Sequence, residues 1–161
     1  MRLALAAPQD APDRRQSPTA RAVARGTARL LSSLGFATVG ELPLASGRRA
    51  DLVGVGRAGD VWIIEIKSSI EDFRADHKWP DYRQHCDRLF FAAALDVPPD
   101  IFPADAGLIV ADAFGASVLR EAPEHRLAAA TRKSLMLRFA RTAAARLQTA
   151  IDPAGPYGEA F

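Results

Sequence analysis

The sequence predicts one α/β domain in which a central mixed β-sheet is flanked by helices. Apolar residues recur with helical spacing near both ends of the chain, at 18–34 and 129–150. Between these segments lie short runs rich in β-branched and aromatic residues, bounded by glycine and proline. A length of 161 residues suits one hydrophobic core better than two. We therefore expect a domain at 17–150 between flexible tails at 1–16 and 151–161.

The first helix is expected to begin at Ser17-Pro18 and to end near Leu34. Serine is a favoured N-cap, proline fits the first helical turn, and Gly35 is a typical stop. On a helical wheel, apolar and arginine side chains fall on opposite sides. The expected inner side comprises Val23, Gly26, Thr27, Leu30, Leu31 and Leu34, and the outer side comprises Arg21, Arg25 and Arg29.

Three strands should follow this helix. Residues 36–44 form the first, and Pro43 marks it as an edge strand because proline lacks the N–H that a central strand needs. Ser46-Gly47 predicts a turn into a second strand at 50–55. The glycine-flanked segment 56–59 predicts a turn into a third strand at 61–67.

The rest of the chain should complete the sheet and cover it. Residues 70–86 suit a helix interrupted at Trp79-Pro80, since proline disfavours helix at the residue before it. Residues 88–94 predict a buried strand, and 107–111 and 117–120 predict two more, joined near Gly115. The expected inner face of the last helix, 129–150, comprises Leu135, Met136, Phe139, Ala143 and Leu147.

Charged residues gather where the third strand ends. Side chains alternate across a strand, so Glu65 and Lys67 emerge on one face. The hairpin brings Asp51 nearby in either of two registers. A two-residue loop sets Asp51 opposite Ile64, whereas one additional loop residue sets it opposite Glu65. Only three of the 21 basic residues are lysines, which makes a lysine beside Glu65 less expected by chance.

Two carboxylates beside a lysine can support metal-assisted hydrolysis of a phosphodiester. Mg²⁺ prefers oxygen ligands and keeps several waters, and Lys67 would orient the nucleophile or offset charge in the transition state. The alternative is that Glu65 and Lys67 form an exposed salt pair and Asp51 is a surface residue near a turn. Glu41 should lie near Asp51 across the preceding turn, where it could bind the metal or orient a ligand.

The same residues resemble a known motif. Asp51 followed by Glu65-Ile66-Lys67 resembles the core motif of the PD-(D/E)XK nuclease superfamily, with Ala50 where many members have proline. Segment 62–92 is similar to the MmcB-like DNA repair proteins of that superfamily. The resemblance implies a restriction-endonuclease-like fold. It also implies Mg²⁺ or Mn²⁺ held by Asp51, Glu65 and the main-chain carbonyl of Ile66. Lys67 would then position the attacking water.

Several other residues are candidates for DNA contact. Arg25 on the first helix could contact phosphates, and so could Lys78, Tyr82 and Arg83, of which the tyrosine could also stack on a base. A mixed solvent-exposed face explains these residues equally well. Basic terminal segments flank an acidic middle, and such ends could bind a polyanion.

Together these features predict a bacterial DNA repair protein with a metal-dependent endonuclease-like site. The alternative is a non-catalytic DNA-binding repair accessory on the same fold. A small-molecule hydrolase is disfavoured because the chain lacks a nucleophile-elbow motif. A zinc site at His77, His85 and Cys86 is disfavoured by their spacing.

The expected partner is DNA of damaged or branched structure, and a homodimer would allow two strands to be addressed. A lone cysteine fits a reducing cytosol, and no apolar run reaches the length of a membrane span. We therefore expect a cytoplasmic, nucleoid-associated protein.

Overall fold

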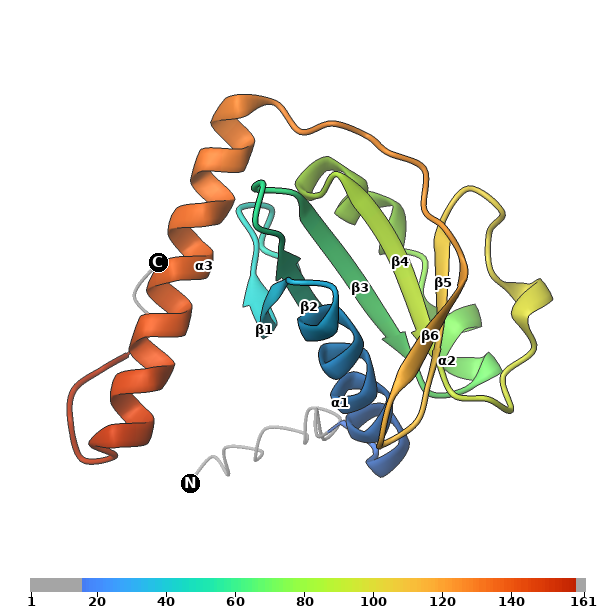
Figure 1. Ribbon diagram of the computed structural model, residues 1–161, viewed down its shortest axis with the longest axis horizontal. Helices are drawn as coiled ribbons and strands as arrows, with labels where there is room; N and C mark the ends of the chain where they lie inside the picture. The colour runs from blue at the N-terminus through green and yellow to red at the C-terminus, as the bar shows by residue number, and fades with distance from the viewer. Residues whose placement is uncertain (1–15, 159–161) are drawn as a thin grey trace, which may run out of the picture.

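The computed structural model describes residues 16–158 (Figure 1). The predicted N-terminal tail lies outside this range except for Gln16, whereas residues 151–158 of the predicted C-terminal tail lie within it. The predicted domain limits stay a prediction. The helices are α1 (Pro18–Ser33), α2 (Ile70–Ala75) and α3 (Ala129–Ile151), with 3₁₀ turns η1 (Trp79–His85) and η2 (Pro99–Ile101). The strands are β1 (Ala37–Pro43), β2 (Arg49–Val55), β3 (Val61–Lys67), β4 (Arg88–Ala93), β5 (Gly107–Ala111) and β6 (Ala116–Arg120).

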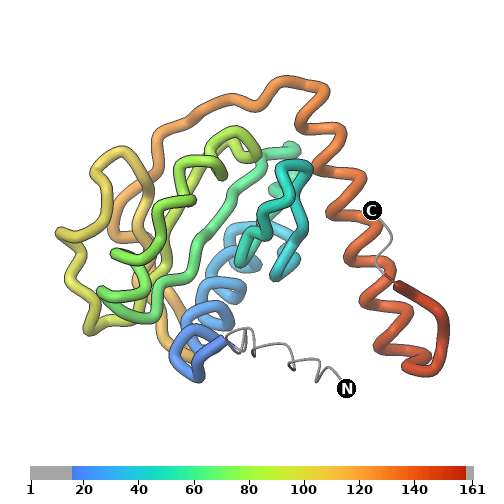
Figure 2. The backbone as a smooth tube through the Cα atoms, turned by 180° about the vertical axis from the view of Figure 1, so that it is seen from behind, coloured from blue at the N-terminus to red at the C-terminus, as the bar shows by residue number. Residues whose placement is uncertain are grey.

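The six strands form one mixed sheet, as predicted, in the order β1-β2-β3-β4-β5-β6. β3, β4 and β5 are parallel, and the other neighbouring pairs are antiparallel. Pro43 lies on the edge strand β1, as expected. Helix α1 covers one face of the sheet (Figure 1), while α2 and η1 lie on the other face, and α3 stands beside β1 (Figure 2).

Each face of the sheet has its own apolar layer. Under α1, Trp62 lies between Phe36 and Phe90, with ring centroids 4.4 and 4.7 Å away. On the other face, Phe91 and Phe102 pack with the rings of α2 and η1. Because β3 and β4 are buried on both faces, their positions are fixed by packing, and the end of β3 becomes a rigid place for charged side chains.

Helix α1 begins and ends where its sequence predicts. The Ser17 side chain accepts a hydrogen bond from the Ala20 N–H, and Gly35 takes the left-handed conformation at φ +86° that ends the helix. The expectation that Leu34 faces the core is wrong. Leu34 is the C-cap, beyond the last helical turn, and it is 50% exposed.

Two later elements differ from the predictions. The segment 70–86 breaks earlier than expected, because α2 ends at Ala75 and Asp76 is extended. Its second part, η1, is a 3₁₀ helix. Along α3, Leu135 is buried, but the expected burial of Leu147 is wrong, since that side chain is 60% exposed.

Candidate active site

The β2–β3 register brings Asp51 opposite Glu65. Leu52 pairs with Ile64 and Val55 with Val61, which is the register with one additional loop residue. That residue fits into the turn because Gly59 adopts φ +89°, a conformation that other residues rarely take. Of the two registers that the sequence allows, the structure has the one that brings the carboxylates together.

The two strands part beyond the Leu52–Ile64 pair, and the two carboxylates occupy the fork. The Ile66 N–H donates to Asp51 Oδ2 at 2.9 Å, and the Asp51 N–H donates to Glu65 Oε1 at 3.3 Å. Each carboxylate is thus held by main chain of the opposite strand. Both side chains are fixed without using all of their acceptor sites.

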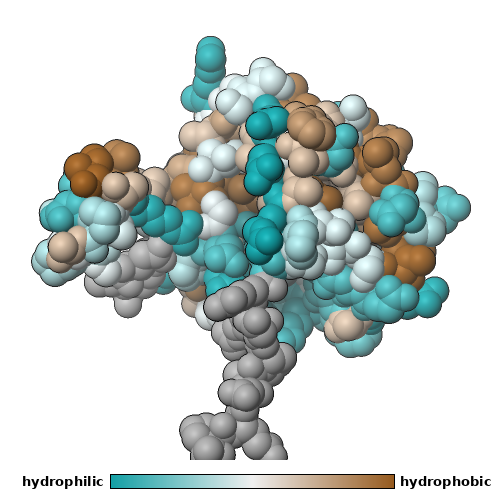
Figure 3. Space-filling view, turned by 90° about the horizontal axis from the view of Figure 1, so that it is seen from below, coloured by the Kyte–Doolittle hydropathy of each residue, from teal (hydrophilic) through white to brown (hydrophobic). Residues whose placement is uncertain are grey.

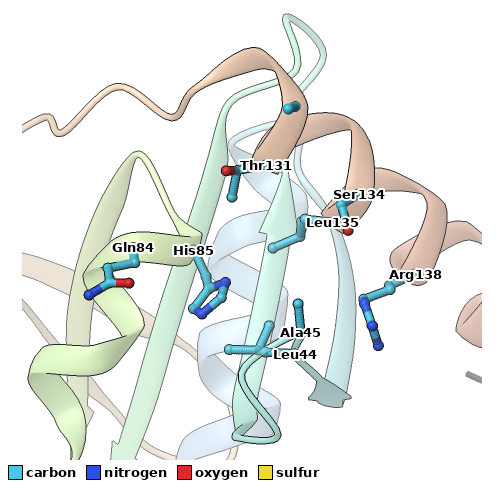
Figure 4. Close-up of a pocket in the computed structure, with 9 residues that line it drawn as sticks. Leu44, Ala45, Gln84, His85, Thr131, Ser134, Leu135 and Arg138 are labelled. Carbon is cyan, nitrogen blue, oxygen red and sulfur yellow. The ribbon is translucent and has the colours of Figure 1, made fainter.

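A hollow of about 330 Å³ opens at this fork. It is lined by Asp51, Glu65, Ile66, Lys67, Ser68 and Asp72, and by Gln16, Ser17 and Ala20 at the start of α1. The three predicted catalytic residues and the predicted main-chain ligand therefore share one cavity wall. A second hollow, of about 390 Å³, lies between η1 and α3 and contains none of them (Figure 4).

Burial controls the charge of the carboxylates. Glu65 is 3% exposed, and burial raises its pKa well above the usual value, with the nearby charge of Asp51 adding to the effect. Burial also raises the pKa of Asp51, although the Ile66 N–H and Lys67 oppose that rise. A pair of carboxylates with raised pKa values favours a cation between them. This donor set fits a hard divalent ion.

Lys67 is held by an acid that the sequence analysis missed. Its ammonium lies 2.6 Å from Asp76 Oδ2, and both side chains are largely buried. Burial by itself would lower the pKa of Lys67, but the hydrogen bond and charge of Asp76, with Glu65 and Asp51, outweigh it and raise that pKa. Lys67 is therefore a fixed positive charge beside the two carboxylates.

Asp72 is a second acid that the sequence analysis missed. Its Oδ2 accepts from the Ser68 N–H at 3.0 Å, and its own N–H donates to Ser69 Oγ at 3.1 Å. This reciprocal capping starts α2 directly after β3 and brings Asp72 into the hollow. The spacing of Ser69 and Asp72 is a capping signal that could have revealed it.

Glu41 lies near Asp51 but lines a neighbouring hollow. It adopts φ +50°, which is uncommon for a residue with a side chain and costs about 1–3 kcal/mol. Its carboxylate is 3.5 Å from the Arg49 guanidinium. Among residues 16–158, no three His, Cys, Asp or Glu side chains are arranged to share one ion. The role of Glu41 as a metal ligand stays a prediction.

The candidate DNA-binding residues differ in their surroundings. Arg25 and Lys78 are exposed. Tyr82 is buried and its hydroxyl donates to the Arg49 carbonyl at 3.1 Å, so the expectation that it stacks on a base is wrong for this structure. Arg83 lies over the Trp79 ring and pairs with Asp105 at 3.0 Å, which restricts it.

Similarity to known proteins identifies the family. The model of the family described as DNA repair protein MmcB-like matches residues 7–154. This chain belongs to the MmcB-like family. The predicted family is thereby confirmed, and the structure confirms the predicted α/β fold with a central mixed sheet, while its restriction-endonuclease-like character stays a prediction. Among the curated proteins compared with this MmcB-like chain, none matches.

Two solved structures are similar to this MmcB-like protein. The SPO1766 protein of unknown function from Silicibacter pomeroyi is 46% identical, with a TM-score of 0.84 over 86% of this chain and 95% of that one. A repair endonuclease from Pyrococcus abyssi is 20% identical, with a TM-score of 0.33 over 52% of this chain and 40% of that one. The second similarity is too slight to carry an argument about activity. Within the described part of the MmcB-like chain, no helix is long and apolar enough to cross a bilayer.

Proposed function

We propose that this MmcB-like protein is a metal-dependent DNA endonuclease that acts in DNA repair. The observation that carries the proposal is the fork between β2 and β3, where Asp51 and Glu65 meet beside the Lys67 ammonium. Membership of a DNA repair family supports the pathway. We further propose that it acts in the cytoplasm at the nucleoid, on damaged or branched DNA.

The donor set suits Mg²⁺ or Mn²⁺. Asp51, Glu65 and the Ile66 carbonyl would hold the ion, and Mg²⁺ commonly binds through one or two carboxylates while keeping several waters. When bound, such an ion supplies Lewis-acid stabilisation of charge on the phosphoryl oxygens.

The remaining chemistry belongs to Lys67 and its partner. The Lys67 ammonium would orient the attacking water and offset the negative charge that grows in the transition state. Asp76 holds this ammonium in place, at 2.6 Å. Arg25 and Lys78, both exposed, would contact phosphates away from the cut.

Cleavage of a DNA panel tests the proposal. Linear, nicked and branched DNAs are incubated with the full chain and with Mg²⁺, Mn²⁺ or a chelator. We expect cutting of at least one substrate with metal and none in chelator. Lys67→Met, which keeps the aliphatic stem, should reduce turnover by about 10²-fold or more. Wild-type protein that cuts no substrate with either metal would contradict the proposal.

The close Lys67–Asp76 pair favours one second candidate, a DNA-binding repair accessory that does not cut. In that case Asp51, Glu65 and Lys67 form a structural ion cluster rather than a catalytic site. Asp51→Asn would then destabilise the fold by several kcal/mol, on the scale of about 3–5 kcal/mol for a broken buried pair. In the endonuclease, the same substitution should abolish cutting with little effect on stability. Urea unfolding of Asp51→Asn separates the two candidates.

A further inference from the structure

A further hollow, of about 550 Å³, lies beside the turn between β5 and β6. It is lined by residues that follow β4 and by residues of the turn and its strands, among them Leu95, Val110, Asp112, Phe114 and Leu119, and we call it the apolar hollow. Three of these side chains are large, apolar and exposed, Phe114 at 82%, Leu95 at 76% and Leu119 at 57%. A contiguous apolar surface that stays exposed often marks a binding site.

Hydrogen bonds of the turn hold the main chain of Phe114 in a fixed place. The N–H groups of Phe114 and Gly115 both donate to Asp112 Oδ1, at 2.7 and 2.9 Å. The Asp112 N–H donates to the Gly115 carbonyl at 3.0 Å, and the Arg29 guanidinium of α1 donates to the Phe114 carbonyl at 3.1 Å. An aromatic ring on a fixed main chain loses little conformational entropy on binding, so this ring is suited to contact a flat partner.

The apolar hollow lies at the same end of the sheet as Lys67. Lys67 of β3 pairs with Ala93 of β4, and Ala93 pairs with Val110 of β5, which lines the hollow. Two strand spacings of about 4.8 Å separate Lys67 from this level of β5, and about three base pairs of duplex, at about 3.4 Å each, span that distance. β3 points towards the molecule's lower face (Figure 1), which is hydrophilic in its middle and carries apolar patches towards its sides (Figure 3). A strand of DNA at Lys67 can therefore reach the apolar hollow within a few nucleotides.

The charges around the apolar hollow favour a nucleotide as its ligand. Arg25 and Arg29 are exposed on α1, one helical turn apart, and Arg29 contacts the turn that carries Phe114. In the part of the chain that the structure describes, no carboxylate lies within ion-pair distance of either guanidinium. The nearby acids, Asp96 and Asp112, belong to the side of β4 and β5. We therefore expect phosphates along α1 and a base over the Phe114 ring.

We propose that Phe114 stacks on an unpaired base of the DNA that is bound at the candidate active site. This inference rests on the proposed endonuclease function and narrows its substrate to DNA with an unpaired segment beside the cut. Inside a duplex both faces of a base are covered by its neighbours, so only an unpaired or terminal base offers a free face to the ring. Arg29 contacts a phosphate of the same strand, and Leu95 and Leu119 shield the edges of the base from water.

Binding of forked DNA in chelator tests the inference without cleavage. A duplex with one unpaired arm carries 2-aminopurine at successive positions of that arm, and the full chain is titrated into it. We expect the fluorescence of 2-aminopurine to be quenched at the position that stacks on Phe114. Phe114→Ala should remove this quenching and weaken binding to forked DNA about tenfold, the scale of one base–aromatic stack, while binding to fully paired duplex is unchanged. Phe114→Tyr, which keeps the ring, should retain both the quenching and the affinity.

Each substitution has a matched control. Leu137→Ala shortens another exposed apolar side chain, on α3 beside the opposite edge of the sheet, and should change neither the quenching nor the affinity. Arg29→Gln should weaken binding to forked and to paired DNA, because a phosphate contact is lost in both. Arg57→Gln removes an equal charge from an exposed arginine in the β2–β3 turn and should leave both affinities unchanged.

The outcomes separate this inference from the proposed function. Unchanged quenching in Phe114→Ala, equal losses on forked and paired DNA, or no binding of forked DNA by the wild type would overturn the inference. So would a Phe114→Ala variant that is a monomer in sedimentation where the wild type is a dimer, and that keeps its affinity for forked DNA, because the apolar hollow would then join two copies of the chain. If stacking on Phe114 is found while the wild type cuts no DNA, the endonuclease proposal fails and the base site stands.

Discussion

Lys67 shows how a single buried charge can shape a site. An ammonium that is almost excluded from water needs a partner, because an unpaired buried charge is costly. Asp76 supplies that partner, and its other oxygen accepts from the Lys78 N–H at 2.8 Å. The same aspartate therefore ends α2 and positions the lysine beside Asp51 and Glu65. Local structure and site chemistry depend on one carboxylate here.

Replacing that carboxylate should be measurable. Asp76→Asn keeps the shape but leaves Lys67 without its nearest charge, so we expect a loss of about 1.5–3 kcal/mol in unfolding free energy. Turnover should fall as well, because the ammonium is no longer held. Urea unfolding measures the loss of unfolding free energy, and the DNA cleavage assay measures the loss of turnover. In a Lys67→Met background the effect of Asp76→Asn on stability should shrink, and equal effects in both backgrounds would show that the pair is not coupled.

The individual site residues differ in how far the sequence could reveal them. Asp51, Glu65 and Lys67 could be predicted because strand alternation and hairpin register bring their positions together. Asp76 could not, because its role depends on where α2 ends. The burial of Tyr82 could not be predicted either, because the tertiary fold turns its ring inwards and pairs its hydroxyl with the Arg49 carbonyl.

At the scale of elements, α1 lies unusually close to the β5–β6 turn. A Cβ at Gly26 would lie 2.1 Å from the Asp112 carbonyl oxygen and 2.4 Å from that of Gly115. Both are main-chain atoms, which cannot rotate away. Glycine at this position therefore sets the distance between the helix and the sheet, and with it the place of Gln16 and Ser17 at the active-site hollow.

Gly26→Ala should accordingly destabilise the protein. Alanine improves helix propensity by up to about 1 kcal/mol, but overpacking against rigid backbone costs about 1–3 kcal/mol or more. The cost of overpacking should exceed the gain in helix propensity, and urea unfolding measures the net change in unfolding free energy. Gly115→Ala is the matched control, because its Cβ meets nothing within 4 Å. A stabilised Gly26→Ala variant would show that α1 can shift freely.

Asp87 joins three elements at the opposite end of the sheet. Arg132 of α3 contacts both of its oxygens, at 2.7 and 2.8 Å. The Val61 and Leu127 N–H groups donate to the same carboxylate at 2.8 and 2.9 Å. Burial would raise the pKa of Asp87, but these hydrogen bonds outweigh it and lower that pKa to about 2. The residue thus fixes the start of α3 to the sheet.

This shift predicts a pH dependence of stability. The pKa of Asp87 in the unfolded chain is about 3.9, above the folded value. Its contribution, about 2–3 kcal/mol, is therefore present above pH 4 or so and is lost as the pH falls towards 2. The difference in unfolding free energy between wild type and Asp87→Asn should narrow over that window, as measured by urea unfolding. If the difference in unfolding free energy between the two proteins stayed constant from pH 2 to 6, the lowered pKa of Asp87 would be contradicted.

The elements themselves could be predicted where a local signal defines them. Ser17, Pro18 and Gly35 define α1, and Pro43 marks β1 as an edge. The break at Asp76 depends instead on a tertiary contact, the Lys67 ion pair, and the 60% exposure of Leu147 does not follow from the apolar period of α3. The spacing of apolar residues along one helix or strand cannot show which tertiary contacts its ends will make.

At the scale of the whole molecule, DNA binding should depend on salt. Affinity for duplex DNA should fall with a log–log slope of about −0.9 per phosphate neutralised. Arg25→Glu should flatten this slope by about one or more, whereas Arg57→Glu serves as a control of equal charge. Arg83 is engaged with Asp105, so its substitution should affect stability more than the slope. An affinity indifferent to salt between 50 and 200 mM would contradict nucleic-acid binding.

We propose that Asp51 and Glu65 together hold one divalent cation. Titration of the full chain with Mn²⁺, followed by electron paramagnetic resonance of the free ion, tests it without any substrate. We expect about one ion per chain for wild type, at least about tenfold weaker binding for Glu65→Gln, on the scale of one lost charged contact, and retained binding for Lys67→Met. Wild-type protein that binds no Mn²⁺, or a Glu65→Gln variant that binds it equally well, would contradict a shared cation site at Asp51 and Glu65.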